Sequence, residues 1–145
     1  MADFASALAL TLKHEGGFVD DKDDLGGATN LGITKATYEA WVGVPVTVED
    51  MRALTVDMVT PIYKKRYWDV LSLDDCQDQR YAESLFDYCV NAGPGAAHKA
   101  NDAARGDLRA LLAAKMEHYE AIVAHRPASE KFLAGWTKRA EEYSA

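Results

Sequence analysis

The strongest constraint on the fold is an apolar repeat of three and four residues, which runs through most of the chain and is interrupted once, near its start. A segment rich in glycine and aspartate, residues 16–34, replaces the repeat there and is typical of a tight loop or a small β-hairpin. We therefore expect a mostly α fold, that is, an α+β helical domain with one small β element after the first helix. The repeat predicts helices over residues 4–14, 34–42, 47–54, 55–68, 79–91, 107–125 and 129–143.

Residues suited to helix ends support these boundaries. Asp3, Thr34 and Thr55 precede predicted helices, and their side chains can accept hydrogen bonds from the free amides of the first turn. Pro61 falls inside the 55–68 pattern, where its missing amide predicts a kink or a break. The repeat also predicts which side chains of the last helix face inward, namely Phe132, Leu133 and Trp136.

Length and composition limit the classes of protein to consider. A chain of 145 residues, 48% of them hydrophobic, can form one domain over residues 1–145 with a core that needs no metal or disulfide. The net charge of −7 argues against a nucleic-acid partner, because phosphate binding needs clustered lysine and arginine. No apolar run is long enough for stable membrane insertion, and the first residues lack a secretory signal, so we expect a cytoplasmic product. We also expect a monomer. Cys89 lies on an apolar helical face and is expected to be a buried free thiol.

The candidate catalytic residues begin at the end of the first predicted helix. This helix delivers Glu15 into the glycine-rich segment, where Asp24 and then Thr29 follow. Glycoside hydrolysis uses such a set, with one carboxylic acid to protonate the leaving oxygen and a second carboxylate to activate water or stabilise the cationic transition state. Packing against a helix end would exclude water from Glu15 and so favour its protonated form, whereas Asp24 in a polar loop would stay ionised. The pattern predicts Glu15 as the acid and Asp24 as the base.

The same segment does not predict a metal site. Leu25 and Gly32 occupy positions at which a calcium-binding loop of the EF-hand type needs oxygen ligands. His118 and His125 lie about two helical turns apart, too far to share one ion easily. We expect neither a metal nor a cofactor.

A set of motifs along the chain carries a family resemblance. The run from Glu15 to Thr34 is followed by Tyr67-Trp68-Asp69, Leu85-Phe86-Asp87, Val90-Asn91-Ala-Gly93-Pro94 and Phe132-Leu-Ala-Gly135-Trp136-Thr-Lys-Arg139. Together these motifs resemble glycoside hydrolase family 108, a group of lysozyme-like muramidases, over nearly the whole chain. The resemblance implies a lysozyme-like fold and hydrolysis of the β-1,4 bond after N-acetylmuramic acid. It also implies that Glu15 is the catalytic acid, with Asp24 and Thr29 matching the second acid and the water-holding threonine of phage-type lysozymes.

One segment departs from the family pattern. Between Pro94 and Leu108 many relatives have a longer insertion that resembles a peptidoglycan-binding module, whereas this chain is short there. A separate wall-binding function is therefore not expected from this segment.

Aromatic and amide side chains near the motifs are candidates for binding substrate. Tyr67 and Trp68 could stack on sugar faces, although aromatic residues at helical spacing are more often part of a core. Asn30 could hold the attacking water in place of Thr29, which could instead cap a turn. The resemblance favours a sugar contact for Asn91, whose alternative role is to cap its helix.

Three hypotheses for the function follow. The first is an inverting muramidase, a peptidoglycan hydrolase in which Glu15 protonates the glycosidic oxygen and Asp24 with Thr29 positions the attacking water. The second is a lytic transglycosylase, which needs only one glutamate. The third is a non-enzymatic lysozyme-like protein that serves as a phage structural part or a glycan-binding module. Resemblance to phage endolysins implies peptidoglycan as the partner and holin-dependent release to the cell wall, or transport in a virion.

Overall fold

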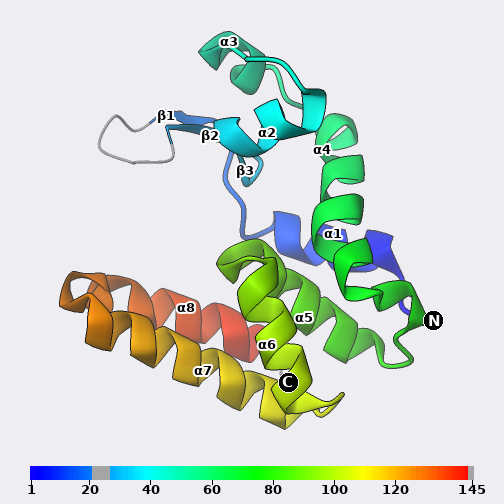
Figure 1. Ribbon diagram of the computed structural model, residues 1–145, viewed down its shortest axis with the longest axis vertical. Helices are drawn as coiled ribbons and strands as arrows, with labels where there is room; N and C mark the ends of the chain where they lie inside the picture. Colours follow the sequence, from blue (N-terminus) through cyan, green and yellow to red (C-terminus); the bar gives the residue numbers. More distant parts are fainter. Residues whose placement is uncertain (21–26, 144–145) are drawn as a thin grey trace.

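The computed structural model describes residues 1–20 and 27–143, arranged as a small part that contains a sheet and a larger bundle of helices (Figure 1). Helix α1 (Phe4–Leu12) precedes an antiparallel sheet of β1 (Val19–Asp20), β2 (Ala28–Asn30) and β3 (Ile33–Thr34), in the order β1-β2-β3. Helices α2 (Lys35–Val42) and α3 (Val48–Arg52) lie beside this sheet.

Helix α4 (Val56–Tyr63) leads from the sheet part to the bundle (Figure 1). It passes into a π-helical turn, Lys64–Trp68, and then into two 3₁₀ turns, Asp69–Leu71 and Leu73–Asp75. The bundle contains α5 (Gln79–Ala92), α6 (Pro94–Ala104), α7 (Leu108–His125), a 3₁₀ turn (Pro127–Ser129) and α8 (Glu130–Glu142). The predicted fold class, mostly α with one small β element after the first helix, is confirmed.

The helix ends follow from side-chain capping. The Asp3 carboxylate accepts from the amide of Ser6 at 3.0 Å, and the Thr34 hydroxyl accepts from the amide of Thr37 at 3.1 Å. Gly43 ends α2 with a φ of 80°, a left-handed conformation that favours glycine. These caps were expected from the residue types, and they fix where α1 and α2 begin.

Two features of the chain after α3 differ from the sequence-based expectation. Regular α-helix does not break at Pro61 but continues to Tyr63, where the π-helical turn begins. No helix was expected over residues 95–107, yet α6 occupies most of this segment and buries Ala97, Ala100 and Ala104. Such small side chains give a weak apolar signal, although their spacing of three and four is helical.

The start of the last helix is more exposed than expected. Phe132 is 50% exposed, and its ring packs beside that of Trp136 with centroids 5.8 Å apart. Trp136 is partly buried and stacks on Tyr119 of α7 at 5.3 Å. Because α8 packs mainly on α7, side chains near its start meet one neighbouring helix rather than a closed core. The expectation that Phe132 faces inward is wrong.

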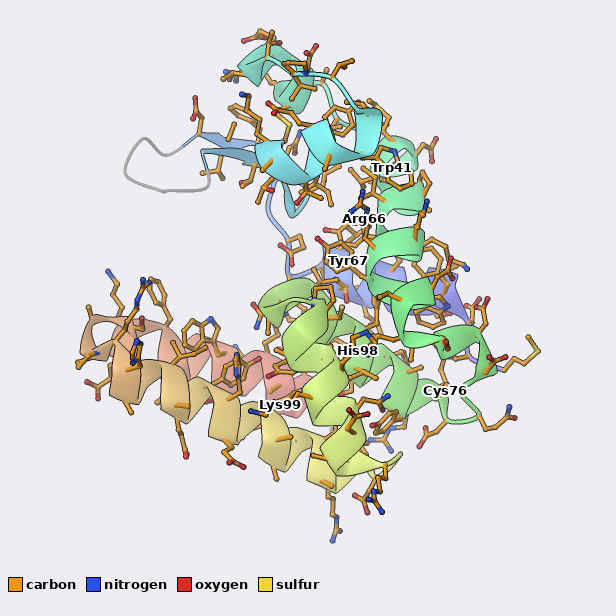
Figure 2. All side chains as sticks on the ribbon, in the orientation of Figure 1. Trp41, Arg66, Tyr67, Cys76, His98 and Lys99 are labelled. Atoms are coloured by element: carbon orange, nitrogen blue, oxygen red, sulfur yellow. The ribbon has the colours of Figure 1, made fainter. Side chains whose placement is uncertain are left out.

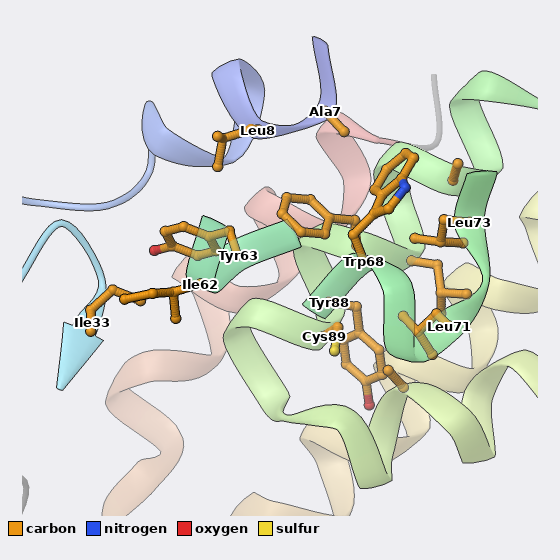
Figure 3. Packing of buried hydrophobic residues seen from close by; sticks show 14 of the residues in the cluster. Ala7, Leu8, Ile33, Ile62, Tyr63, Trp68, Leu71, Leu73, Tyr88 and Cys89 are labelled. Atoms are coloured by element: carbon orange, nitrogen blue, oxygen red, sulfur yellow. The ribbon is translucent and has the colours of Figure 1, made fainter. Parts of the chain in front are cut away.

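The buried apolar side chains form one cluster that joins α1, α4, the π-helical turn and α5 (Figure 3). The ring of Trp68 is fully buried, 5.4 Å from Phe4 and 5.6 Å from Phe86 between centroids. Cys89 is a buried free thiol, as predicted. Within the described part of the chain, no helix is both long enough and apolar enough to cross a membrane.

A cation is enclosed in the bundle behind this core. Lys115 of α7 is 1% exposed, and its Nζ donates to the carbonyl oxygen of Ser84 at 3.0 Å and to the Ser84 hydroxyl at 2.7 Å. The rings of Tyr88 and Tyr143 lie 5.5 Å and 5.6 Å from Nζ. Burial lowers the pKa of Lys115 to about 8, although the charge of Asp87 acts in the opposite direction.

This lowered pKa predicts a pH dependence of stability. Between about pH 8 and pH 10 the unfolded chain keeps the Lys115 proton while the folded chain releases it, so this group makes the free energy of unfolding rise with pH. The free energy of unfolding of wild type minus that of Lys115→Met should therefore rise by about 2 kcal/mol over this interval. Urea unfolding at both pH values measures it. Lys99→Met, at an exposed position of α6, is the control, and parallel curves for wild type and Lys115→Met would contradict the prediction.

Candidate active site

Glu15 belongs to the segment between α1 and β1, which Figure 1 shows running from the bundle to the sheet part. The end of α1 is closed by the amide of His14, which donates to the carbonyl oxygen of Thr11 at 3.0 Å. Gly16 and Gly17 then continue the chain away from the helix. The side chain of Glu15 is 18% exposed, so its carboxyl group is largely enclosed but still reachable from solvent.

The turn between β2 and β3 lies directly against Glu15. The amide of Leu31 donates to the carbonyl oxygen of Gly16 at 3.1 Å, which joins the turn to the segment that carries Glu15. Gly32 has a φ of 78°, and a Cβ atom at this position would lie 2.9 Å from both Cγ and Cδ of Glu15. Only glycine combines this backbone conformation with such a close approach.

Tyr63 holds the same turn through a hydrogen bond. This residue is fully buried at the end of α4, and its hydroxyl donates to the carbonyl oxygen of Leu31 at 2.6 Å. Burial raises the pKa of the Tyr63 phenol well above its usual value, and the nearby charge of Glu15 adds to the effect. Tyr63 therefore remains a hydrogen-bond donor at every physiological pH.

Arg139 of α8 forms an ion pair with Glu15. Its Nη2 donates to Oε1 of Glu15 at 3.0 Å, and the same nitrogen donates to Oδ1 of Asp87 at 2.8 Å. Its Nε donates to Oδ2 of Asp87 at 2.9 Å. Burial alone would lower the pKa of Arg139, but the hydrogen bonds and charges of Asp87 and Glu15 raise it above its usual range. The guanidinium is thus permanently charged and is shared between two carboxylates.

Asp87 is the buried member of this group. It lies on α5 and is 2% exposed. Besides the two bonds from Arg139, its Oδ1 accepts from the hydroxyls of Thr11 at 2.9 Å and Tyr143 at 3.1 Å. Sequence reasoning assigned no role to Asp87 or Arg139. The helical pattern gave no signal for Asp87, because most residues one turn away from it, Glu83, Ser84 and Asn91, are polar.

Of the two predicted partners of Glu15, the structure describes Thr29. Asp24 lies outside the described residues. Thr29 is partly buried in β2, opposite Val19 of β1 and Thr34 of β3. This strand leads directly into the turn that covers Glu15, so Thr29 belongs to the same small region of the fold.

Two of the predicted substrate contacts have structural partners. Asn30 is buried, and its side-chain nitrogen donates to the carbonyl oxygens of Met51 at 2.9 Å and Arg52 at 3.3 Å, which ties β2 to α3. Trp68 is fully buried, and its indole nitrogen donates to the Asp74 carboxylate at 2.8 Å. The expectation that Trp68 stacks on a sugar is not met, because core side chains cover its ring.

Tyr67 and Asn91 are both partly exposed. The side-chain nitrogen of Asn91 donates to the Tyr119 hydroxyl at 3.1 Å and so joins α5 to α7. Figure 2 shows Tyr67 and Arg66 together on the π-helical turn, with Trp41 of α2 nearby. A hollow of about 350 Å³ opens here between α2, this turn and the start of α6, lined by Ala36, Thr37, Ala40, Arg66, Tyr67 and Pro94.

The close approach at Gly32 can be tested by thermodynamics alone. Gly32→Ala and Gly43→Ala add a methyl group at almost equal φ values of 78° and 80°, so the cost in backbone strain is similar, about 1–2 kcal/mol. The new carbon meets Glu15 and the Tyr63 hydroxyl at position 32, whereas nothing lies within 4 Å at position 43. Gly32→Ala should therefore lower the free energy of unfolding by about 1–3 kcal/mol more than Gly43→Ala. Equal losses of unfolding free energy in urea would show that the turn at position 32 is not in close contact with Glu15.

Comparison with known proteins places this geometry in a family. The family model described as Glycosyl hydrolase 108 matches residues 8–93, a segment that includes Glu15, Tyr63 and Asp87. A solved structure described as SagA of Brucella abortus is similar with a TM-score of 0.80 and 29% sequence identity, covering 97% of this chain and 91% of that one. Comparison with curated proteins gives no match. The fold is the α+β fold of lysozyme-like proteins, and the chain belongs to the glycosyl hydrolase 108 family.

Proposed function

We propose that this glycoside hydrolase acts on peptidoglycan as a muramidase, cutting the β-1,4 bond between N-acetylmuramic acid and N-acetylglucosamine. The observation that carries the proposal is the Glu15 carboxyl group, 18% exposed between the sheet part and the bundle and fixed by Arg139. Glycoside hydrolysis requires a carboxylic acid held in this way beside the scissile bond. Membership of the glycosyl hydrolase 108 family supports the reaction class.

Glu15 is proposed as the general acid. Oε1 accepts the hydrogen bond from Arg139, which leaves Oε2 as the oxygen proposed to carry the proton. Transfer of this proton to the glycosidic oxygen leaves a carboxylate on Glu15. Arg139 then stabilises the new negative charge, which lowers the energy of the transition state in which it develops.

The second half of the reaction requires a positioned water. We assign this role to Asp24 as the base and to Thr29 as the residue that orients the water, which gives inversion at the anomeric carbon. The location of Thr29 in β2, one residue before Asn30 and the turn over Glu15, supports the assignment. In this mechanism the water approaches from the sheet side while Glu15 protonates the leaving oxygen.

The glycan is proposed to run past Tyr67. The hollow lined by Tyr67 and Pro94 joins α2 of the sheet part to the start of α6 in the bundle, which suits a strand crossing between them. An aromatic ring with one exposed face is a common platform for the apolar side of a sugar. Asn91 remains a candidate for a polar contact to the sugar.

The biological setting follows from the same proposal. A muramidase of this kind would act at the cell wall as a monomer, after synthesis in the cytoplasm and holin-dependent release, or as part of a virion. A lytic transglycosylase is the alternative reaction, because it also uses one glutamate as its acid but leaves an anhydro end on the sugar.

The proposal predicts the behaviour of Glu15→Gln on purified peptidoglycan. The amide cannot donate a proton to the leaving oxygen, so the rate of turbidity loss should fall by about 100-fold or more. Mass spectrometry of the products of the wild type should show reducing ends that have gained one water. Proton NMR of the first product should show the inverted anomer.

Controls and opposing outcomes are specific. Glu130→Gln changes an exposed carboxylate on α8 and should keep full activity. Anhydro ends would show that the reaction is transglycosylation and not hydrolysis. Retention of the anomeric configuration would contradict the inverting role of Asp24. Equal activity of wild type and Glu15→Gln would contradict the assignment of Glu15, and absence of turnover in both would leave a glycan-binding protein.

A further inference from the structure

We propose that Asp87 is a positioning residue, which holds the Arg139 guanidinium in the orientation that reaches Glu15 and compensates its charge whenever Glu15 is protonated. This inference rests on the proposed function, since it concerns how Glu15 changes its charge during catalysis. It assigns a role in the reaction to a side chain that is itself closed off from substrate, with 2% exposure.

The geometry of the ion pair supports the positioning role. Nε and Nη2 of Arg139 bind the two oxygens of Asp87 at 2.9 Å and 2.8 Å, a two-point contact that fixes the plane of the guanidinium. Nη2 also reaches Oε1 of Glu15 at 3.0 Å, so one nitrogen connects the two carboxylates. Rotation of the guanidinium away from Asp87 would therefore also break its contact with Glu15.

Asp87 is itself held by two further hydroxyl groups, one from α1 and one just after α8. The hydroxyl of Thr11, near the end of α1, and that of Tyr143, just after α8, both donate to Oδ1. Its neighbours on α5, Phe86 and Tyr88, are almost fully buried. A buried ion pair is commonly no more stabilising than apolar side chains of similar volume, so stability alone does not require a carboxylate here. The hydrogen-bonded connection of Asp87 to Glu15 through Arg139 gives a reason for a carboxylate at this position.

The charges around this group balance when Glu15 is ionised, and Arg139 keeps a charged partner when Glu15 is protonated. With Glu15 ionised, two carboxylates face the cations of Arg139 and Lys115. With Glu15 protonated, Asp87 still compensates Arg139, whose side chain is 15% exposed. A buried cation without a partner carries a large desolvation cost, and Asp87 prevents that cost when Glu15 takes up its proton.

Other titratable groups face the network from each neighbouring element. The charge of Glu15 acts on Tyr63 and Tyr67, and the charge of Asp87 acts on Tyr119 of α7. The His14–Glu142 ion pair, 2.9 Å between Nε2 and Oε2, lies beside Tyr143. Burial raises the pKa of each of these tyrosines above its ordinary value, so they stay neutral over the pH range of the test.

The first test is an NMR titration of the Glu15 carboxyl carbon in wild type and Asp87→Asn, with the resonance assigned through Glu15→Gln. In Asp87→Asn the amide oxygen can still accept a hydrogen bond from Arg139 but carries no negative charge, so the charge of Arg139 falls on Glu15 alone, which favours the ionised carboxylate. The titration midpoint of Glu15 should move to lower pH by about one unit. An unchanged midpoint in a folded Asp87→Asn protein overturns the proposal. This measurement needs no turnover, so it stays informative if the protein does not cleave peptidoglycan.

The second test uses kinetics on peptidoglycan. Asp87→Asn should lower kcat by about 10- to 100-fold with little change in KM, and the alkaline limb of its pH profile should move to lower pH. A loss of activity in proportion to the unfolded fraction, with the pH profile unchanged, overturns the proposal. A wild type that is inactive while the Glu15 midpoint moves as expected contradicts the proposed function and leaves this inference intact.

Two further variants separate positioning from folding. Asp78→Ala removes the cap of α5, whose carboxylate accepts from the amides of Arg80 and Tyr81, and should lower thermal stability without moving the pH profile. The double variant Asp87→Asn with Arg139→Gln removes both members of the Asp87–Arg139 ion pair together and keeps the test available if Asp87→Asn alone unfolds. If Asp87 acts through Arg139, kcat of the double variant equals that of Arg139→Gln. A further multiplicative loss overturns the proposal.

Discussion

The geometry of the site depends most on the enclosure of the Asp87 and Arg139 charges between α5 and α8. A buried carboxylate and a buried guanidinium each cost several kcal/mol to remove from water, and the pair is tolerated because each partner satisfies the other. In this chain every oxygen of Asp87 has a donor, from Arg139, Thr11 or Tyr143. The pair therefore links α1, α5 and α8, and through Arg139 it fixes the surroundings of Glu15.

The sheet part contributes the opposite boundary of the site. Its short strands bury few side chains, so their arrangement relies on discrete contacts. The Tyr63 hydroxyl binds the carbonyl oxygen of Leu31, and the absent side chain of Gly32 leaves room for Glu15. Glu15 is thus confined between a permanent cation and a backbone turn. Confinement of this kind reduces the motion of a catalytic group before the substrate arrives.

Sequence reasoning succeeded where the causes are local. Caps such as Asp3 and Thr34 act within three residues, so their chemistry is visible in the chain itself. The position of Glu15 at the mouth of a glycine-rich loop is equally local. The role of Arg139 could not be predicted in this way, because it depends on the approach of helices that are distant in sequence. Trp68 and Tyr67 show the same limit, since which of two adjacent aromatic residues enters the core depends on how the turn that carries them packs against distant segments.

The ion pair between Glu15 and Arg139 joins residues separated by 124 positions. During synthesis on the ribosome, Glu15 emerges early and remains without its cation until α8 has been translated. The helices between them can form from local contacts before that time, but the site cannot. Competence for chemistry is therefore acquired late in the life of the nascent chain, and a product that stops short of Arg139 lacks the bond that holds Glu15 in place.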